Sequence, residues 1–320
     1  ITTNDSGSDT AGDVSIHGGT TALVFGNSTI DGDLTLTSTA TGATGITDTG
    51  TLDIRGTTTI SASGVDITLN SAANNFQGAV GIDGSDVILV DAGTIDLGAS
   101  TVTGTYNLTA GGSVTDSGAL AITGVTTIDA SSGNVTLNTT TNNFQGAVKI
   151  DGVNVTVVDA GAIDLGASTV TGTYAVTATS GGDITDSGVL TITGLATFTA
   201  ASGQNVTLNE TSTFSSDVNF TTASGNLANV TITDTNDFEI QALTLSGNLG
   251  VTSTGGSITD DGALAISGTS SFTTSASNED ITLDITTNAF TGAVALNTTG
   301  STGNAEVDGG TTQLDIAAST

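Results

Sequence analysis

The chain repeats itself about every 70 residues, and this periodicity limits what it can fold into. The stretch 90–106, VDAGTIDLGASTVTGTY, returns at 158–174 with one change, from Thr94 to Ala162. The segment NNFQGAV recurs with the same offset, at 74–80 and at 142–148. Such self-similarity is typical of arrays whose units stack on their neighbours and cannot bury a core alone.

A third marker, Thr-Asp followed by Ser, Thr or Asp and then Gly, divides the chain into blocks of similar length. Its aspartates are Asp48, Asp116, Asp186 and Asp260. We therefore expect a single solenoid segment over residues 1–320. Its expected internal repeats are a degenerate first repeat at 1–45, then about 46–113, 114–183, 184–257 and an incomplete 258–320.

Both ends of the sequence favour an excerpt of a longer chain or a processed product. The chain begins at Ile1 rather than at Met, and it ends in DIAAST at 315–320. That ending echoes DLGAST at 96–101, so the last repeat is expected to continue or to stack on another subunit.

The composition favours short strands around a narrow core. The chain has no Pro, Met or Trp and only 3% aromatic residues, while Thr, Val and Ile, which pack well on pleated surfaces, are abundant. Apolar residues fall in i, i+2 pairs such as Ile67/Leu69 and Ile95/Leu97. Turn-forming Gly, Asp, Asn and Ser separate these pairs, and no helical periodicity is sustained.

These patterns predict an all-β fold, a right-handed parallel β-helix (β-solenoid) with about three coils per repeat of roughly 68–74 residues. The expected coil has about 22–23 residues, and the hand follows from the preference of strand crossovers. Equivalent residues of successive blocks should then stack in columns. The expected columns are a buried one with Phe76, Phe144 and Phe214, a corner with Asp48, Asp116 and Asp186, and amide or hydrated positions at Asn70, Asn138 and Asn209.

The net charge of −30 excludes several classes of partner. Nucleic-acid binding needs cations that neutralise phosphates, and docking to anionic lipid is disfavoured for the same reason. The absence of Cys removes disulfides and thiol chemistry. No run approaches the ~20 apolar residues of a membrane span, so we expect no membrane insertion.

Catalysis has little support in the sequence. His17 is the only histidine, and Arg55 and Lys149 are the only basic residues. Lyases that act on polysaccharides usually need Arg or Lys to neutralise a uronate, so a polysaccharide-processing β-helix is a distant alternative. We expect no enzyme, no catalytic residues and no cofactor.

Closely spaced carboxylates are weak candidates for calcium ligands, because calcium prefers clustered oxygen donors. The candidates are Asp83, Asp86, Asp234, Asp237, Asp260 and Asp261. None of them fits an EF-hand loop or a calcium-binding nonapeptide repeat. Solvated turn aspartates are the favoured interpretation, and we assign no metal site.

Phrases such as GGDITDSGVLTITG at 181–194 and GNVTLNTTTNNFQGAV at 133–148 resemble the repeats of filamentous-haemagglutinin-like large exoproteins. The resemblance implies a long right-handed β-helix, secreted or displayed on a bacterial surface and used in adhesion and biofilm contact. That family's secretion domain carries an Asn-Pro motif. This chain has no proline, so the resemblance does not extend to that domain.

The sequence thus predicts a structural and adhesive segment of a bacterial extracellular or cell-surface fibre. The expected partners are the chain itself, through coil stacking or fibre continuation, and glycans or proteins of host or neighbouring cells. The alternative is a self-assembling filament subunit that stacks end to end.

Overall fold

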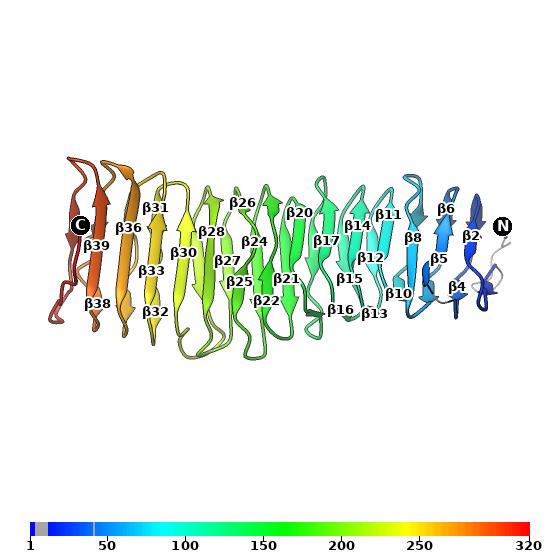
Figure 1. The fold of residues 1–320 in the computed structure, drawn as a ribbon, viewed down its shortest axis with the longest axis horizontal. Coiled ribbons are helices and arrows are strands. Elements are labelled where there is room, and N and C mark those ends of the chain that lie inside the picture. The colour runs from blue at the N-terminus through cyan, green and yellow to red at the C-terminus, as the bar shows by residue number, and fades with distance from the viewer. Residues whose placement is uncertain (4–11, 41) are drawn as a thin grey trace. The chain divides into compact units, whose positions relative to one another are not determined.

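The computed structural model describes residues 1–3, 12–40 and 42–320, and in this part it contains strands and turns but no helix. Residues 4–11 and 41 of the degenerate first repeat therefore lie outside the described residues. The chain divides into two units, Ile1–Ala160 and Gly161–Thr320 (Figure 1). Strand pairing is parallel within both units, which confirms an all-β parallel solenoid.

In the first unit most strands pair with the third strand after them in the chain. The first column contains β1 (Val14–His17), β4 (Leu34–Thr37), β7 (Thr58–Ser61), β10 (Val80–Gly84), β13 (Ser100–Val102), β16 (Leu120–Ile122) and β19 (Asn143–Phe144). The second contains β2 (Leu23–Phe25), β5 (Gly42–Asp48), β8 (Val65–Leu69), β11 (Val87–Asp91), β14 (Tyr106–Ala110), β17 (Thr126–Ala130) and β20 (Val148–Gly152). The third contains β3 (Ser28–Ile30), β6 (Leu52–Ile54) and β9 (Asn75–Phe76), and it ends there. Beyond it, β12 (Ile95–Leu97), β15 (Val114–Asp116), β18 (Val135–Leu137) and β21 (Val155–Asp159) join the sheet of the first column, where Val80 of β10 pairs with Leu97 of β12.

The second unit is also built of parallel ladders, in which a strand pairs with the second or the third strand after it. One ladder contains β22 (Ile163–Leu165), β25 (Ile184–Asp186), β28 (Val206–Phe214), β30 (Val230–Asp234), β33 (Leu249–Ser253), β36 (Ser270–Ser277) and β39 (Val294–Thr299). Another contains β24 (Tyr174–Ala178), β27 (Ala196–Thr199), β29 (Val218–Thr221), β31 (Phe238–Ile240), β34 (Ile258–Asp260), β37 (Ile281–Leu283) and β40 (Ala305–Val307). Shorter ladders join β23 (Ser168–Val170) to β26 (Leu190–Ile192), and join β32 (Leu243–Leu245), β35 (Leu264–Ile266) and β38 (Ala289–Phe290).

The core of each unit is a narrow stack of alternate side chains. Strands such as β8 and β14 bury every second residue, as the period-two pattern predicts. The largest buried side chains include Tyr106, Phe144 and Phe198, each at most 2% exposed. Because neighbouring coils are joined by backbone ladders, each coil provides the surface on which the next one packs.

One sequence block makes three coils and a fraction of a fourth. From Phe144 the register runs back in three coils through Ile122 and Val102 to Gly84. Gly84 lies eight positions (84 − 76) after Phe76, the block equivalent of Phe144, so three coils do not fill the block. The three coils have 18, 20 and 22 residues (102 − 84, 122 − 102 and 144 − 122), close to the expected length, and the repeat holds about three coils as predicted.

The predicted column of phenylalanines is wrong as a result. Phe76 stacks on Ile54, whereas Phe144 stacks on Ile122 on another face. Both phenyl rings are buried as expected, at 1% and 2% exposure. The predicted aspartate corner fails in the same way, since Asp48 pairs with Phe25 and Asp116 pairs with Leu97 in different columns.

The cause is the length of three coils relative to the block. Three coils of this ladder take 60 residues (144 − 84), whereas the block has 68 (144 − 76), so the block ends part-way through a fourth coil. The second unit shows a similar offset. Ile184 leads through Val206 and Val230 to Leu249 in three coils, and Ile258, the block equivalent of Ile184, comes nine positions (258 − 249) later. Within each unit, equal phrases of sequence are thus offset by part of a coil from one block to the next.

Candidate functional site

Aspartates at the exposed turns are used to join coils. Thr57 N donates to Asp33 Oδ1 at 2.7 Å, from the coil that follows. In the same way, Thr105 donates to Asp86 Oδ1 through its backbone N–H at 2.7 Å and through its hydroxyl at 2.9 Å. These two hydrogen bonds hold the pKa of Asp86 below its ordinary value. The acidic turns are therefore part of the scaffold.

In three blocks the marker aspartate is paired with a buried asparagine. Asn142 is fully buried and donates through Nδ2 to Asp116 Oδ2 at 2.6 Å. Its Oδ1 accepts the backbone N–H of Leu120 at 2.8 Å, so the amide joins two coils. The same pair occurs as Asp48 with Asn74 and as Asp260 with Asn288, at 2.6 and 2.7 Å.

The remaining block lacks this amide. Ser212 takes the place of the asparagine, and its hydroxyl accepts the Leu190 N–H at 2.9 Å. Asp186 keeps backbone donors from Asn209 and Glu210. Burial raises the pKa of Asp186 to about 6, against these hydrogen bonds, and the nearby Glu210 carboxylate adds to the increase.

A second buried aspartate binds the backbone N–H of the recurring phenylalanine. Asp91 Oδ2 accepts the Phe76 N–H at 2.7 Å, and its Oδ1 accepts the Gly93 N–H at 2.7 Å. Burial nonetheless raises the pKa of Asp91. Asp159 binds Phe144 N in the same way at 2.7 Å. Both oxygens of Asp91 are thus engaged by the protein.

Asp234 is the equivalent residue of the block at 184–257, and its geometry differs. Its Oδ1 accepts the N–H groups of Phe214, Thr235 and Asn236 at 3.1, 2.6 and 3.4 Å. Its Oδ2 is buried and has no hydrogen-bond partner among the described residues, and the whole residue is 1% exposed. Burial is the main cause of the raised pKa of Asp234, and Asp237 contributes to it.

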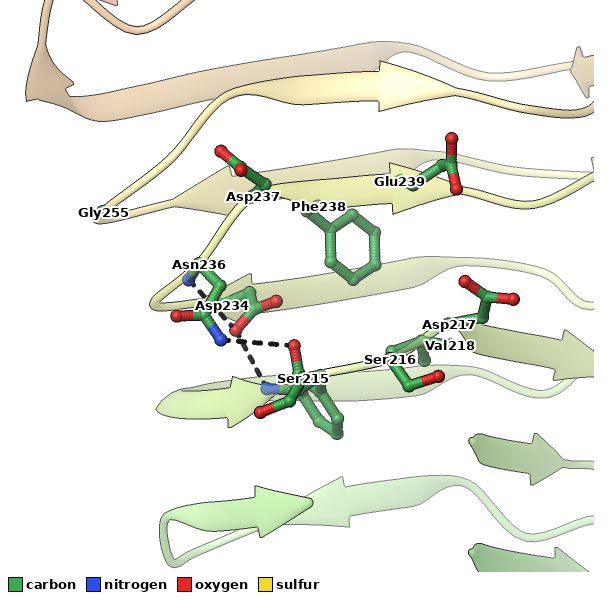
Figure 2. A pocket seen from close by; sticks show the side chains of 11 residues that line it. Ser215, Ser216, Asp217, Val218, Asp234, Asn236, Asp237, Phe238, Glu239 and Gly255 are labelled. Carbon is green, nitrogen blue, oxygen red and sulfur yellow. Dashed lines mark hydrogen bonds between the residues drawn. The ribbon is translucent and has the colours of Figure 1, made fainter. Parts of the chain in front are cut away.

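A cavity of about 530 Å³ opens beside Asp234 in the second unit (Figure 2). It lies between the turn that joins β28 to β29 and the turn that joins β30 to β31. Three further carboxylates line it, those of Asp217, Asp237 and Glu239. Figure 2 shows these carboxyl groups standing apart from one another, and one oxygen of Asp234 pointing away from its hydrogen bonds toward Phe238. This acidic cavity is the candidate site.

The calcium candidates of the sequence analysis lie in different surroundings. Asp234 and Asp237 both line the cavity, Asp260 binds Asn288, and Asp86 binds Thr105. Asp261 is exposed and Asp83 is half-buried on β10. In the described ranges, no three His, Cys, Asp or Glu side chains are grouped so that they could hold a metal ion.

The candidate catalytic groups lie in the first unit. His17 is exposed on β1 and contacts the Thr37 hydroxyl. Arg55 forms an ion pair with Asp31 at 2.8 Å, and Lys149 approaches Asp151 at 3.7 Å. Across the part of the chain that the structure describes, no helix has the length and apolar character needed to cross a membrane.

The buried asparagines were not predicted from the sequence. The predicted position was Asn70, whose backbone N–H donates to Asp48 at 3.0 Å, whereas the side chain that completes the pair is that of Asn74. A signal was present, since Asn74 and Asn142 each follow the marker aspartate by 26 residues. A polar residue repeated at a fixed distance from another is typical of a paired position.

Four stretches of the chain match the family described as repeats of unknown function (DUF5649), at residues 11–83, 84–151, 152–221 and 227–297. These matches cover most of the sequence and have the length of the blocks. The chain belongs to the DUF5649 repeat family. No curated protein and no solved structure shows a significant match to the chain.

The DUF5649 matches begin at a different point of the same period from the boundaries drawn at the Thr-Asp marker. One match, 84–151, holds ten strands, from β11 to all but the last residue of β20. The family unit is thus a block of about ten strands, which is not a whole number of coils.

Proposed function

We propose that this DUF5649 chain is a structural and adhesive segment of a bacterial extracellular or cell-surface fibre. The observation that carries the proposal is the parallel ladder that runs from coil to coil within each unit. Coils are also joined by buried and turn side chains, as at Asn142 and Asp86. Such an array suits a stiff and protease-resistant spacer.

The offset between block and coil adds an argument for adhesion. NNFQGAV lies on one face at 74–80 and on another at 142–148. A repeated surface is therefore displayed in more than one direction. Weak contacts made many times by such a surface add up through effective concentration, so glycans or proteins of host or neighbouring cells are the proposed partners.

A bead assay tests this function. Beads coated with the chain at increasing density should be retained on bacterial or host-cell surfaces with a dependence on density steeper than linear. Beads coated with an acidic protein of similar net charge serve as the control. Equal retention of both coatings would overturn the adhesive role, and rapid digestion of the folded chain by proteases would overturn the spacer role.

A self-assembling filament subunit is the second candidate. Large apolar side chains at Ile1, Val24 and Ile316 are 49%, 62% and 49% exposed, and such groups can be covered by another copy. Sedimentation velocity over a hundredfold range of concentration decides the matter. Growth in mass that is suppressed by a charged or proline-bearing cap after Thr320 supports assembly, and a monomer throughout rejects it.

We also propose that the chain turns over no substrate. Incubation with neutral and uronate-containing polysaccharides should release no new reducing or unsaturated ends. Release that His17→Ala or Arg55→Ala abolishes would replace the structural function by an enzymatic one.

A further inference from the structure

The acidic cavity between the β28–β29 and β30–β31 turns contains an unpaired buried acceptor. In the first unit, the equivalent Asp91 engages one oxygen with Phe76 N and the other with Gly93 N. At Asp234, all three backbone N–H groups converge on Oδ1, and Oδ2 has no partner among the described residues. A buried acceptor has lost its hydration, so a ligand that donates a hydrogen bond there is favoured.

The charge around this acceptor specifies the donor. Asp217, Asp237 and Glu239 line the same cavity, so four acidic residues surround a ligand inside it, although Asp237 Oδ1 also accepts the Ser257 N–H at 2.8 Å. Residues 161–320 contain 16 Asp and Glu and no Lys, Arg or His, so the second unit has no cationic side chain of its own. A ligand that neutralises the cavity must therefore bring positive charge from outside.

The geometry distinguishes an organic cation from a metal ion. A directly bound metal needs several oxygens at roughly 2.0–2.6 Å from one point. The carboxylates of the described part form no such group of three, and Figure 2 shows those of the cavity standing apart. A volume of about 530 Å³ falls in the range of small-molecule pockets. Ser216 and Asn236 add neutral polar groups for the remainder of a ligand.

We propose that this cavity binds a small organic molecule through a primary ammonium group, which donates to Asp234 and is held among Asp217, Asp237 and Glu239. The ammonium group offers three donors to spatially separated acceptors, which is the arrangement that the cavity presents. This site is independent of the spacer and adhesive functions proposed above. It is absent from the equivalent position at Asp91, where both oxygens are engaged.

Isothermal titration in a buffer of physiological salt concentration tests the proposal with a matched pair of probes. The full chain should bind 1,4-diaminobutane saturably with one site, whereas butane-1,4-diol, which is similar in size and uncharged, should not bind. The double variant Asp217→Asn/Glu239→Gln should weaken diamine binding at least tenfold. Neither side chain makes a hydrogen bond or ion pair found in the structure's described contacts, so the fold should be retained.

The control separates a site from general attraction to a polyanion. Asp261→Asn/Glu306→Gln makes the same change of net charge at two exposed positions of the same unit and should bind the diamine like the parent. Equal weakening by both double variants, or no saturable binding by the parent, would overturn the proposal. So would calcium chloride alone binding in the cavity more tightly than the diamine. Asp234→Asn, which places an amide N–H where Oδ2 stands, should also abolish binding, and an unchanged melting temperature shows that it folds.

Discussion

The block at 184–257 is built from nearly the same kinds of strands as the two blocks before it, but its buried carboxylates are satisfied differently. Asp116 receives an amide N–H from Asn142, whereas Asp186 has the smaller Ser212 in the place of that asparagine. Asp91 has a backbone donor on each oxygen, whereas Asp234 has one oxygen without a donor in the described part of the chain.

The backbone ladder is therefore retained even where hydrogen bonds of the buried side chains have been lost. The parallel register is kept within both regions, although β28 is irregular between Leu208 and Ser212. Where the amide is kept, the aspartate belongs to a closed hydrogen-bond set. Burial raises the pKa of Asp186, which has lost the amide, and also the pKa of Asp260, which keeps it. The block of Asp186 is the one that contains the cavity. Buried polar groups are costly when they are partly satisfied, so this region should be the weaker one.

The largest expected effect is at a closely packed glycine that both regions contain. Gly118 and Gly188 are block equivalents, and a Cβ at either would overlap the backbone N of Ala99 or Ala167 in the coil before. Because backbone cannot move aside cheaply, we expect Gly118→Ala and Gly188→Ala each to cost about 3 kcal/mol or more, measured by urea unfolding. Gly26→Ala, with nothing within 4 Å, is the control and should be nearly neutral. A cost at only one of the two glycines would break the equivalence.

Removal of the Asn142 amide should make the surroundings of Asp116 resemble those of Asp186, which has no such amide. Asn142→Ala leaves Asp116 Oδ2 without its amide donor and the Leu120 N–H without its acceptor. We expect a loss of about 2–3 kcal/mol and faster amide exchange at Leu120. The neighbouring Asn143 is exposed, and Asn143→Ala should change stability by less than about 0.5 kcal/mol. Similar costs for the two variants would show that the buried pair contributes nothing special.

The pH dependence of stability tests the same comparison at Asp186. The folded-state pKa of Asp186 is about 6, above the ordinary value of 3.8, so between these values the folded chain holds a proton that the unfolded chain has released. Stability should therefore increase as pH falls from about 6 to about 4 and be lowest, for this group, above about pH 6. At neutral pH, Asp186→Asn should be more stable than the parent by about 1 kcal/mol of unfolding free energy, a figure discounted for solvent screening. At pH values below the ordinary pKa of aspartate, where folded and unfolded chains both hold the proton, the two proteins should differ little. Thermal melts of both proteins across this range measure it, and a constant difference at all pH values would contradict it.

The smallest effect concerns the cations, which only the first unit contains. The Arg55 side chain is 58% exposed and pairs with Asp31 at 2.8 Å. Arg55→Ala should cost less than about 1 kcal/mol at low salt, and the cost should fall toward zero in about 1 M NaCl. A loss that persists in high salt would mean that the arginine stabilises the unit by packing rather than by charge.

Several features of the fold could be predicted from the sequence because they depend on local patterns. The i, i+2 pairs such as Ile67/Leu69 indicated the buried faces of strands, and the repeat period indicated a stacked array. The column prediction failed at Phe76 and Phe144 because it assumed a whole number of coils in a block. Coil length depends on how sharply each corner turns, and a period in sequence does not contain that information.

The candidate site was only half visible in the sequence. Asp234 and Asp237 were noticed as neighbouring carboxylates, but Asp217 and Glu239 were not, since the cavity joins turns of successive coils. The unpaired oxygen of Asp234 follows from the direction of three backbone N–H groups. That direction is set by the chain path through the turn after Asp234.

The sequence by itself determined the class of structure, because strand propensity, alternation and a fixed repeat are local properties of the residues. It also determined the negative charge that any partner must meet. Tertiary structure alone decided which residues meet across coils. The pairing of Asp116 with Asn142 and the cavity shared by Asp217 and Glu239 both depend on the number of residues in each turn. Because three coils are shorter than one block, equal sequences fall at different positions on the coil, as at Phe76 and Phe144.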